Sequence, residues 1–149
     1  MLEDSFFAVY DKFKLEFFRS VFALVREREG SLSAMEAFSL EIIRELNEPT
    51  VGQFAEFLNI SQSNATYKVA SLIKKGYIVK ENSDEDRREY HLLLSDKYYG
   101  YIGLMQDYIA TVTERIRARF PKEDVEKIAA MFDIIANELM PEAGEPLRA

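Results

Sequence analysis

The chain has 149 residues, 48% of them hydrophobic and 13% aromatic, which is enough apolar material for the core of one domain. Its formal net charge of −7 is unfavourable for a protein that would bind nucleic acid over its whole surface. The absence of cysteine excludes disulfides, thiol chemistry and the common structural zinc sites, and the lack of a long apolar run or a basic leader predicts a soluble, cytoplasmic protein with no membrane partner.

The first predicted element is a long amphipathic helix over residues 1–30, which we expect to end at Gly30. Its apolar residues recur at steps of three and four and form one stripe, made of Phe6, Tyr10, Phe13, Phe17, Val21 and Leu24. A second stripe widens this face and consists of Phe18, Phe22 and Val25. A helix that is apolar around so much of its circumference must pack against more than one neighbour, inside the chain or across a subunit boundary.

Two N-terminal capping signals follow, each a Ser or Thr with a Glu or Gln three residues later. Ser33 with Glu36 predicts the start of a helix that runs to about Leu46, and Thr50 with Gln53 predicts the start of a shorter one. The side chains expected to face the core are Phe38, Ile42, Ile43 and Leu46 in the first helix, and Phe54, Ala55 and Leu58 in the second.

A third helix of this group is predicted over residues 61–76, with Ser61 as its N-cap and Gly76 at its C-terminal end. Only Asn59 and Ile60 separate it from the preceding helix, so the two form a helix-turn-helix. The core side is set by Ala65, Val69 and Leu72. The helical step of about 100° then turns outward Ser63, Tyr67, Ala70 and Lys74.

The outward face of the 61–76 helix has the composition that a helix in the major groove of DNA needs. Hydrogen-bonding side chains near its N-terminus reach base edges, and cations farther along reach phosphates. The residues expected to contact DNA are Ser61, Gln62, Ser63, Asn64, Thr66, Tyr67, Lys68, Ser71, Lys74 and Lys75. Residues 61–80 contain four lysines and no acid, so the basic charge coincides with this helix. For each residue taken alone, an ordinary exposed helix surface is the alternative interpretation.

Beyond Gly76 the segments YIVK and YHLLL predict two short strands joined by a polar loop over residues 81–89, an antiparallel hairpin that forms a wing. The tip carries Asp86, Arg87 and Arg88. Paired arginines on a hairpin tip can enter a minor groove, and Asp86 can pair with one of them and stabilise the loop. A solvated charge cluster is the alternative interpretation of the same residues.

Two further helices are predicted over residues 96–140, with Pro121 and Pro141 bracketing the second of them. The first stripe consists of Tyr98, Ile102, Met105, Ile109, Val112 and Ile116. The second consists of Val125, Ile128, Phe132, Ile135 and Leu139. Residues 141–149 are short, polar and rich in Pro and Gly, and we expect a flexible tail there.

The segment SNATYKVASLIKKGYIVKENSDEDRREYHLLLS resembles the recognition helix and wing of the MarR family of bacterial regulators. The residues that carry the resemblance are Leu72, Lys74-Lys75-Gly76, Asp86-Arg87-Arg88 and Leu94-Ser95. It implies a mainly α fold with a small antiparallel β-hairpin wing, in one domain over residues 1–149. Residues 33–95 would form the winged helix-turn-helix lobe, and residues 1–30 and 96–140 the dimerisation helices.

The resemblance also implies a function. The chain would be a homodimeric repressor of a pseudo-palindromic site on double-stranded DNA, with a pocket for a small lipophilic or aromatic effector between the dimerisation helices and the lobe. Phe17, Phe22 and Phe38 are candidates to line that pocket, although a phenylalanine stripe also serves as core. Tyr67 and Ser71 stand where many relatives carry arginine, which leaves the operator sequence open.

Nothing in the sequence points to catalysis. The single histidine, His91, lies in a predicted strand and is expected to be structural, so we predict no metal site. No glycine-rich phosphate loop follows a strand and no G-x-S-x-G motif occurs, so we predict no cofactor and no enzyme activity. Two alternatives to a repressor stay open: a transcription activator with the same fold, and a winged-helix protein-interaction module that does not bind DNA.

Overall fold

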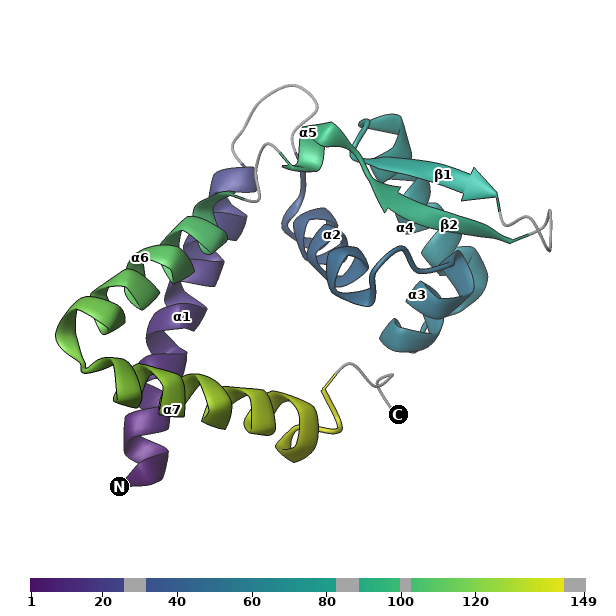
Figure 1. Ribbon diagram of the computed structural model, residues 1–149. Helices are drawn as coiled ribbons and strands as arrows, with labels where there is room; N and C mark the ends of the chain where they lie inside the picture. The colour runs from purple at the N-terminus through teal and green to yellow at the C-terminus, as the bar shows by residue number, and fades with distance from the viewer. Residues whose placement is uncertain (26–31, 83–88, 100–102, 144–149) are drawn as a thin grey trace.

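The computed structural model describes residues 1–25, 32–82, 89–99 and 103–143 (Figure 1). The helices are α1 (Leu2–Leu24), α2 (Ala34–Leu46), α3 (Val51–Leu58), α4 (Gln62–Lys74), α5 (Asp96–Tyr99), α6 (Gly103–Arg119) and α7 (Lys122–Ile134), which continues into the π-helical turn η1 (Ile135–Leu139). The strands are β1 (Ile78–Asn82) and β2 (Tyr90–Leu94). This order confirms the predicted fold class, a mainly helical chain with one antiparallel hairpin.

Both predicted capping boxes are present and set where α2 and α3 begin. The Ser33 Oγ accepts the Glu36 N–H at 3.2 Å, and the Glu36 carboxylate accepts the Ser33 N–H at 2.9 Å. Thr50 and Gln53 make the same reciprocal pair at 3.1 and 2.9 Å. Two amides at each helix start are therefore satisfied by side chains, as the spacing of these residues predicts.

The first helix ends earlier than the predicted Gly30. α1 stops at Leu24, and the following Val25 donates its N–H to both Val21 O and Phe22 O, at 3.1 and 3.2 Å. Such a shared bond tightens the last turn of a helix and is common at helix ends. Gly30 itself lies outside the described residues.

The hydrophobic core belongs to a lobe formed by α2, α3, α4, the hairpin and α5. Its fully buried members include Leu40, Ile43, Phe54, Leu72, Leu92 and Tyr98, and Val21 near the end of α1 joins them. Tyr98 is a departure from the sequence pattern, which placed it on the stripe of the following long helix. The structure instead puts it in the short helix α5 and buries it in the lobe, where its hydroxyl donates to Glu41 of α2.

The hairpin pairs its strands in antiparallel register, with Ile78 opposite Leu94, Lys80 opposite Leu92 and Asn82 opposite Tyr90. β2 matches the prediction, whereas β1 begins one residue later than the YIVK segment. Tyr77 is left out of the strand because its N–H closes the end of α4 by donating to Leu72 O at 3.0 Å.

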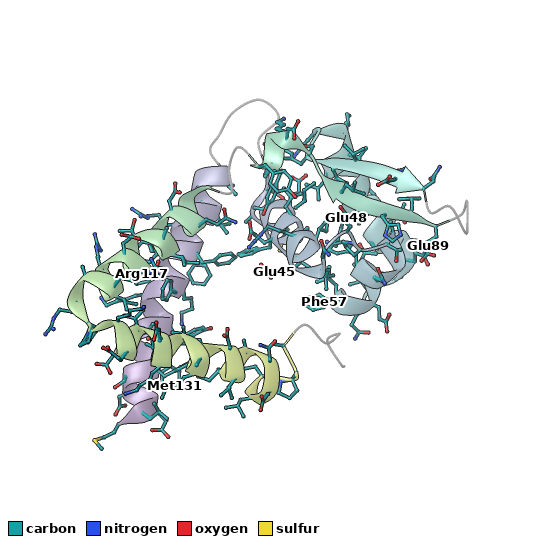
Figure 2. All side chains as sticks on the ribbon, in the orientation of Figure 1. Glu45, Glu48, Phe57, Glu89, Arg117 and Met131 are labelled. Atoms are coloured by element: carbon teal, nitrogen blue, oxygen red, sulfur yellow. The ribbon has the colours of Figure 1, made fainter. Side chains whose placement is uncertain are left out.

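Helices α1, α6 and α7 form an arm beside the lobe (Figure 1). α6 runs antiparallel to α1, and the rings of Phe13 and Tyr108 meet edge to face with centroids 5.6 Å apart. α7 then turns back beneath the lobe, and Figure 2 shows Met131 on this helix. Large apolar side chains stay exposed on the arm, among them Phe6, Phe7, Tyr10, Phe22, Met131, Phe132 and Leu139. Among the described residues, no helix is long and apolar enough to span a membrane.

Candidate nucleic-acid interface

Helix α4 is held in place from both ends. At its start, Asn59 adopts a left-handed conformation with φ of 53°, and the Ser61 Oγ caps the helix by accepting the Asn64 N–H at 3.2 Å. At its end, Gly76 has a φ of 83°, which glycine adopts without the penalty that a Cβ imposes. The Ser61 cap and the left-handed Gly76 were expected from the sequence, whereas the left-handed Asn59 was not. The helix is thereby set at a fixed angle to α3, its helix-turn-helix partner.

The buried and exposed sides of α4 are those predicted. Ala65, Val69 and Leu72 are at most 1% exposed and seal the helix onto the core. The opposite side presents to solvent the polar residues Gln62, Ser63, Asn64, Thr66, Tyr67 and Lys74, with Ala70 among them. Tyr67 is 80% exposed, an unusual position for a large aromatic ring in a monomer. The first two turns of α4 therefore form an exposed hydrogen-bonding surface free of large aliphatic side chains.

Two of the predicted contact residues are already bound within the lobe. The Ser71 Oγ donates to Glu36 Oε2 at 2.8 Å, and the Lys75 Nζ donates to Glu36 Oε1 at 2.7 Å. Glu36 lies in the first turn of α2, so its carboxylate caps α2 and ties that helix to α4. Sequence reasoning identified Glu36 only as a cap. The signal it did not use is that Ser71 and Lys75 are four residues apart and so lie on one face of α4.

The Glu36 carboxyl is strongly stabilised in its charged form. Burial alone would raise its pKa, but the hydrogen bonds from Lys75, Ser33 and Ser71 outweigh burial and lower the pKa to about 2. Glu36 thus stays ionised across the physiological range and neutralises Lys75 locally. The cations that α4 presents without this neutralisation are Lys68, which is half-buried, and Lys74, which is exposed.

The wing extends from the C-terminal end of α4, as Figure 1 shows. The Lys80 ammonium on β1 lies over the Tyr90 ring of β2, 4.6 Å from its centroid, a cation–π contact across the hairpin. The predicted tip residues Asp86, Arg87 and Arg88 lie outside the described residues, so their roles stay predictions.

The short helix α5 and the residue before it join the wing to α4. Ser95 donates its hydroxyl to Gly76 O and its N–H to Tyr77 O, the latter at 2.9 Å. Lys97 donates to Lys75 O at 2.8 Å, at the C-terminal end of α4, where a cation is favoured by the helix dipole. The last turn of α4 is therefore bonded both to α2 and to α5.

His91 occupies a structural position in the lobe. Its Nδ1 lies 2.8 Å from Glu48 O, so this nitrogen carries the proton and donates to the carbonyl. His91 also bridges Thr50, which connects β2 to the start of α3. Within the described ranges there is no group of three or more His, Cys, Asp or Glu side chains placed to hold a metal ion.

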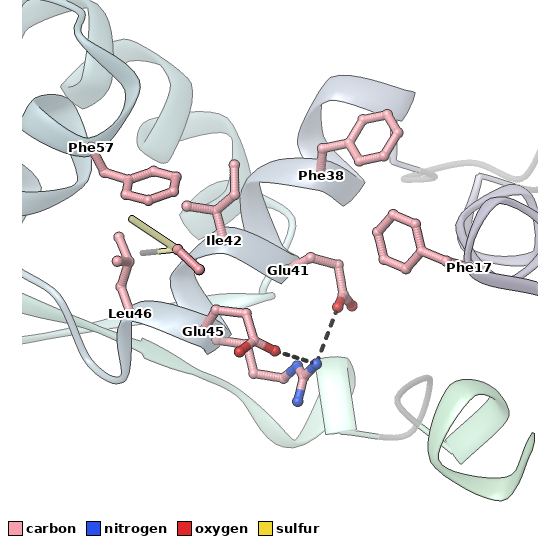
Figure 3. Close-up of a pocket in the computed structure, with 9 residues that line it drawn as sticks. Phe17, Phe38, Glu41, Ile42, Glu45, Leu46 and Phe57 are labelled. Carbon is pink, nitrogen blue, oxygen red and sulfur yellow. Dashed lines mark hydrogen bonds and ion pairs between the residues drawn. The ribbon is translucent and has the colours of Figure 1, made fainter. Parts of the chain in front are cut away.

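A pocket of about 660 Å³ lies beside α2, between the arm and the lobe (Figure 3). It is lined by Phe17, Phe38, Glu41, Ile42, Arg44, Glu45, Leu46, Phe57 and Ala143. The structure thus brings together two of the three phenylalanines predicted to line a pocket, Phe17 and Phe38, whose ring centroids are 6.1 Å apart. The third, Phe22, lies on α1 with 77% of its surface exposed and does not line this pocket.

Comparisons with known proteins agree with this geometry. Residues 32–90 match the model of the MarR family. Comparison with the curated proteins gives no match.

Several solved structures share the fold over nearly their whole length. A MarR-like transcriptional regulator from Thermotoga maritima is 21% identical, with a TM-score of 0.57 over 93% of this chain and 94% of that one. Streptococcus pneumoniae FabT, solved in complex with DNA, is 20% identical, with a TM-score of 0.60 over 93% and 94%. A mutant of S. aureus MepR bound to an oligodeoxyribonucleotide is 12% identical, with a TM-score of 0.56 over 94% and 99%.

Proposed function

We propose that this chain, whose residues 32–90 form a MarR-family winged helix-turn-helix domain, is a transcription regulator that binds specific sites on double-stranded DNA. The observation that carries the proposal is the exposed polar surface on the first two turns of α4. Asn64 and Gln62 have side-chain amides of the kind that bind adenine in the major groove, and Thr66 carries a methyl group that suits thymine. Lys68 and Lys74 follow on the same helix, where phosphates would lie.

We further propose that the chain acts as a homodimer. Phe6, Phe7 and Tyr10 on α1 and Met131 and Phe132 on α7 are each about half exposed. Large exposed apolar side chains of this kind are typical of an interface, and a second copy of the chain offers the same helices as a partner. Two α4 helices related by a twofold axis would contact half-sites about one turn of DNA apart, so the operator would be a pseudo-palindrome.

Repression by occlusion of a promoter in the cytoplasm is the mechanism we favour, with release when an effector fills the pocket beside α2. An effector acts only if it binds better to the form with the wrong lobe spacing, because differential affinity is what shifts a conformational equilibrium. An activator would use the same fold and surface. A winged-helix protein-interaction module is the second candidate function, favoured by the net charge of −7 and by the neutralisation of Lys75.

Selection of bound duplexes from a random DNA pool at about physiological salt tests the proposal. Enrichment of an inverted repeat would establish a sequence-specific dimeric regulator. No enrichment, from protein shown to be folded and dimeric, would favour the interaction module.

Two variants then test the surface. The double variant Asn64→Ala with Tyr67→Ala should reduce affinity for the selected site at least tenfold, because each base contact is worth about 1–3 kcal/mol. Glu56→Gln, an exposed carboxylate on α3, should leave the melting temperature and the dimer unchanged and serves as the control. The predicted wing tip is tested separately by replacing Arg87 and Arg88 with Ala, and unaltered operator affinity in that variant would eliminate the wing contact.

A further inference from the structure

We propose that the pocket between α1, α2 and α3 binds a lipophilic cation. This inference rests on the proposed effector-responsive function and assigns the chemical class of the effector. It follows from the aromatic walls and from the balance of charge at one edge of the pocket. At about 660 Å³, the pocket has the size of a site for a drug-sized molecule.

The walls of the pocket are mainly apolar and supply three aromatic rings from three helices. Phe17 comes from α1, Phe38 from α2 and Phe57 from α3, and Figure 3 shows Phe57 at the opposite end from the Phe17–Phe38 pair. Ile42 lines the wall between them, and Leu46 lies at the same end as Phe57. Aromatic faces attract cations as well as apolar groups, at about 0.5–2 kcal/mol for a favourably placed charge. The walls therefore suit a bulky organic cation whose charge is spread over apolar substituents.

The polar edge of the pocket carries two carboxylates and one guanidinium. The Arg44 Nη2 is 2.7 Å from Glu45 Oε1 and 3.5 Å from Glu41 Oε2, as the dashed lines in Figure 3 mark. The other oxygen of Glu41 accepts the Tyr98 hydroxyl. Although burial alone would lower it, the two carboxylates raise the pKa of Arg44, so its positive charge is retained. Two carboxylates and one guanidinium leave the edge with a net charge of −1. A bound cation would neutralise this charge, whereas a bound anion would add to it.

One atom of this edge points to a competing ligand class. The Arg44 Nε is buried and makes no hydrogen bond among the described residues. Such an N–H is costly to leave unpaired and would be satisfied by an acceptor on a ligand. A neutral ligand with a hydrogen-bond acceptor therefore has to be compared with the cation. An anionic ligand also has to be compared, because it would bring both a hydrogen-bond acceptor and a negative charge.

Three probes of related shape separate these classes. Tetraphenylphosphonium is a lipophilic cation, tetraphenylborate is its anionic counterpart, and triphenylphosphine oxide is a neutral molecule with a strong acceptor oxygen. Binding to the full chain is measured by isothermal titration calorimetry and checked by equilibrium dialysis. We expect tetraphenylphosphonium to bind at least tenfold more tightly than either of the others. Equal or tighter binding of the borate or the oxide, or no binding of the cation, would overturn the proposal.

Glu45→Gln tests the charge at the edge without removing bulk. The Glu45 side chain is 71% exposed, so the variant should fold normally, and its salt bridge should be worth little to stability. Cation affinity should fall about two- to fivefold, and that of the borate should rise. Glu56→Gln removes the same charge from α3 away from the pocket lining and should change neither. If the two variants lowered the affinity for the cation equally, the net charge of the protein alone would attract the cation, and the proposed site would be rejected.

Failure of this inference can be told from failure of the proposed function, because DNA selection is run without any probe and probe binding is run without DNA. An enriched operator with no preference for the cation would reject the ligand class and leave the regulator. Cation binding in the pocket with no enriched operator would reject the regulator and leave a cation-binding site. If an operator is enriched and the cation also binds, tetraphenylphosphonium should weaken operator binding by the wild type, and it should weaken operator binding by Glu45→Gln to a smaller extent.

Discussion

Replacing Glu36 with Gln should destabilise the protein in a way that depends on pH. The carboxylate of Glu36 caps α2 through Ser33 and holds Ser71 and Lys75 of α4. Gln has nearly the same shape but no charge, so the variant removes the ion pair while keeping most of the packing. The change therefore isolates the charge that ties α4 to α2.

The magnitude follows from the pKa of Glu36, which falls from its ordinary value of 4.5 to about 2 in the folded protein. Without screening, such a shift corresponds to about 3 kcal/mol of folding free energy at neutral pH. The side chains of Glu36 and Lys75 are 16% and 26% exposed, so water screens part of the interaction. We expect Glu36→Gln to cost about 1–2 kcal/mol at pH 7.

The direction of the pH dependence is set by the same pKa. Because the pKa is lower in the folded than in the unfolded chain, the contribution of Glu36 is fully present above about pH 5 and is lost as the pH falls through about 2. The difference between wild type and variant should fall to less than about half its neutral value by pH 3. Urea unfolding at pH 7, 5 and 3, with protein concentration held fixed, measures this difference.

The control for Glu36→Gln is the same substitution at a different glutamate. Glu56→Gln makes the same chemical change at an exposed site on α3 and should alter stability by less than about 0.5 kcal/mol at every pH. A Glu36→Gln cost that is no larger than that of the control, or that stays constant between pH 7 and pH 3, would refute the account of Glu36 as an ionic tie.

Three further changes test the lobe by thermal and urea denaturation. Gly76→Ala should cost about 1–2 kcal/mol from its φ of 83° alone, since a Cβ there would meet nothing closer than Lys97 Cδ at 3.9 Å; a neutral result would contradict the left-handed turn. Tyr98→Phe should cost about 1–2 kcal/mol because it removes the hydrogen bond to Glu41 from a buried site, and a stabilised variant would count against that bond. Leu72→Ala should cost about 2–5 kcal/mol by opening a cavity under α4, and a loss below about 1 kcal/mol would mean that Leu72 is not in the core.

The lobe could be predicted from the sequence because local rules act there. The capping boxes at Ser33 and Thr50 and the left-handed Gly76 each depend on residues close in the chain, and each is present. The core side of α4 follows from helical periodicity. Capping, turn chemistry and apolar periodicity all indicate the same helices in this part of the chain, so its structure can be predicted from the sequence.

Features that depend on distant residues were missed. Tyr98 fits the periodicity of the following helix, but it is buried in the lobe instead, where its hydroxyl donates to Glu41, 57 positions away. In the same way, the partners of Ser71 and Lys75 lie 35 and 39 positions earlier. The early end of α1 has no breaker residue at Leu24 that a pattern could reveal. Periodicity cannot predict these contacts, because the residues that make them come together only in the folded chain.

The tie from α4 to Glu36 divides α4 into a part that can vary and a part that cannot. Substitutions at Gln62, Asn64 or Tyr67 change side chains that face solvent, so they should have little effect on folding while changing the proposed DNA contacts. Substitutions at Ser71 or Lys75 also remove support from α2. If α4 reads DNA as proposed, new operator preferences should arise mainly through changes in the first two turns of α4, and changes in its last turn should require a compensating change at position 36.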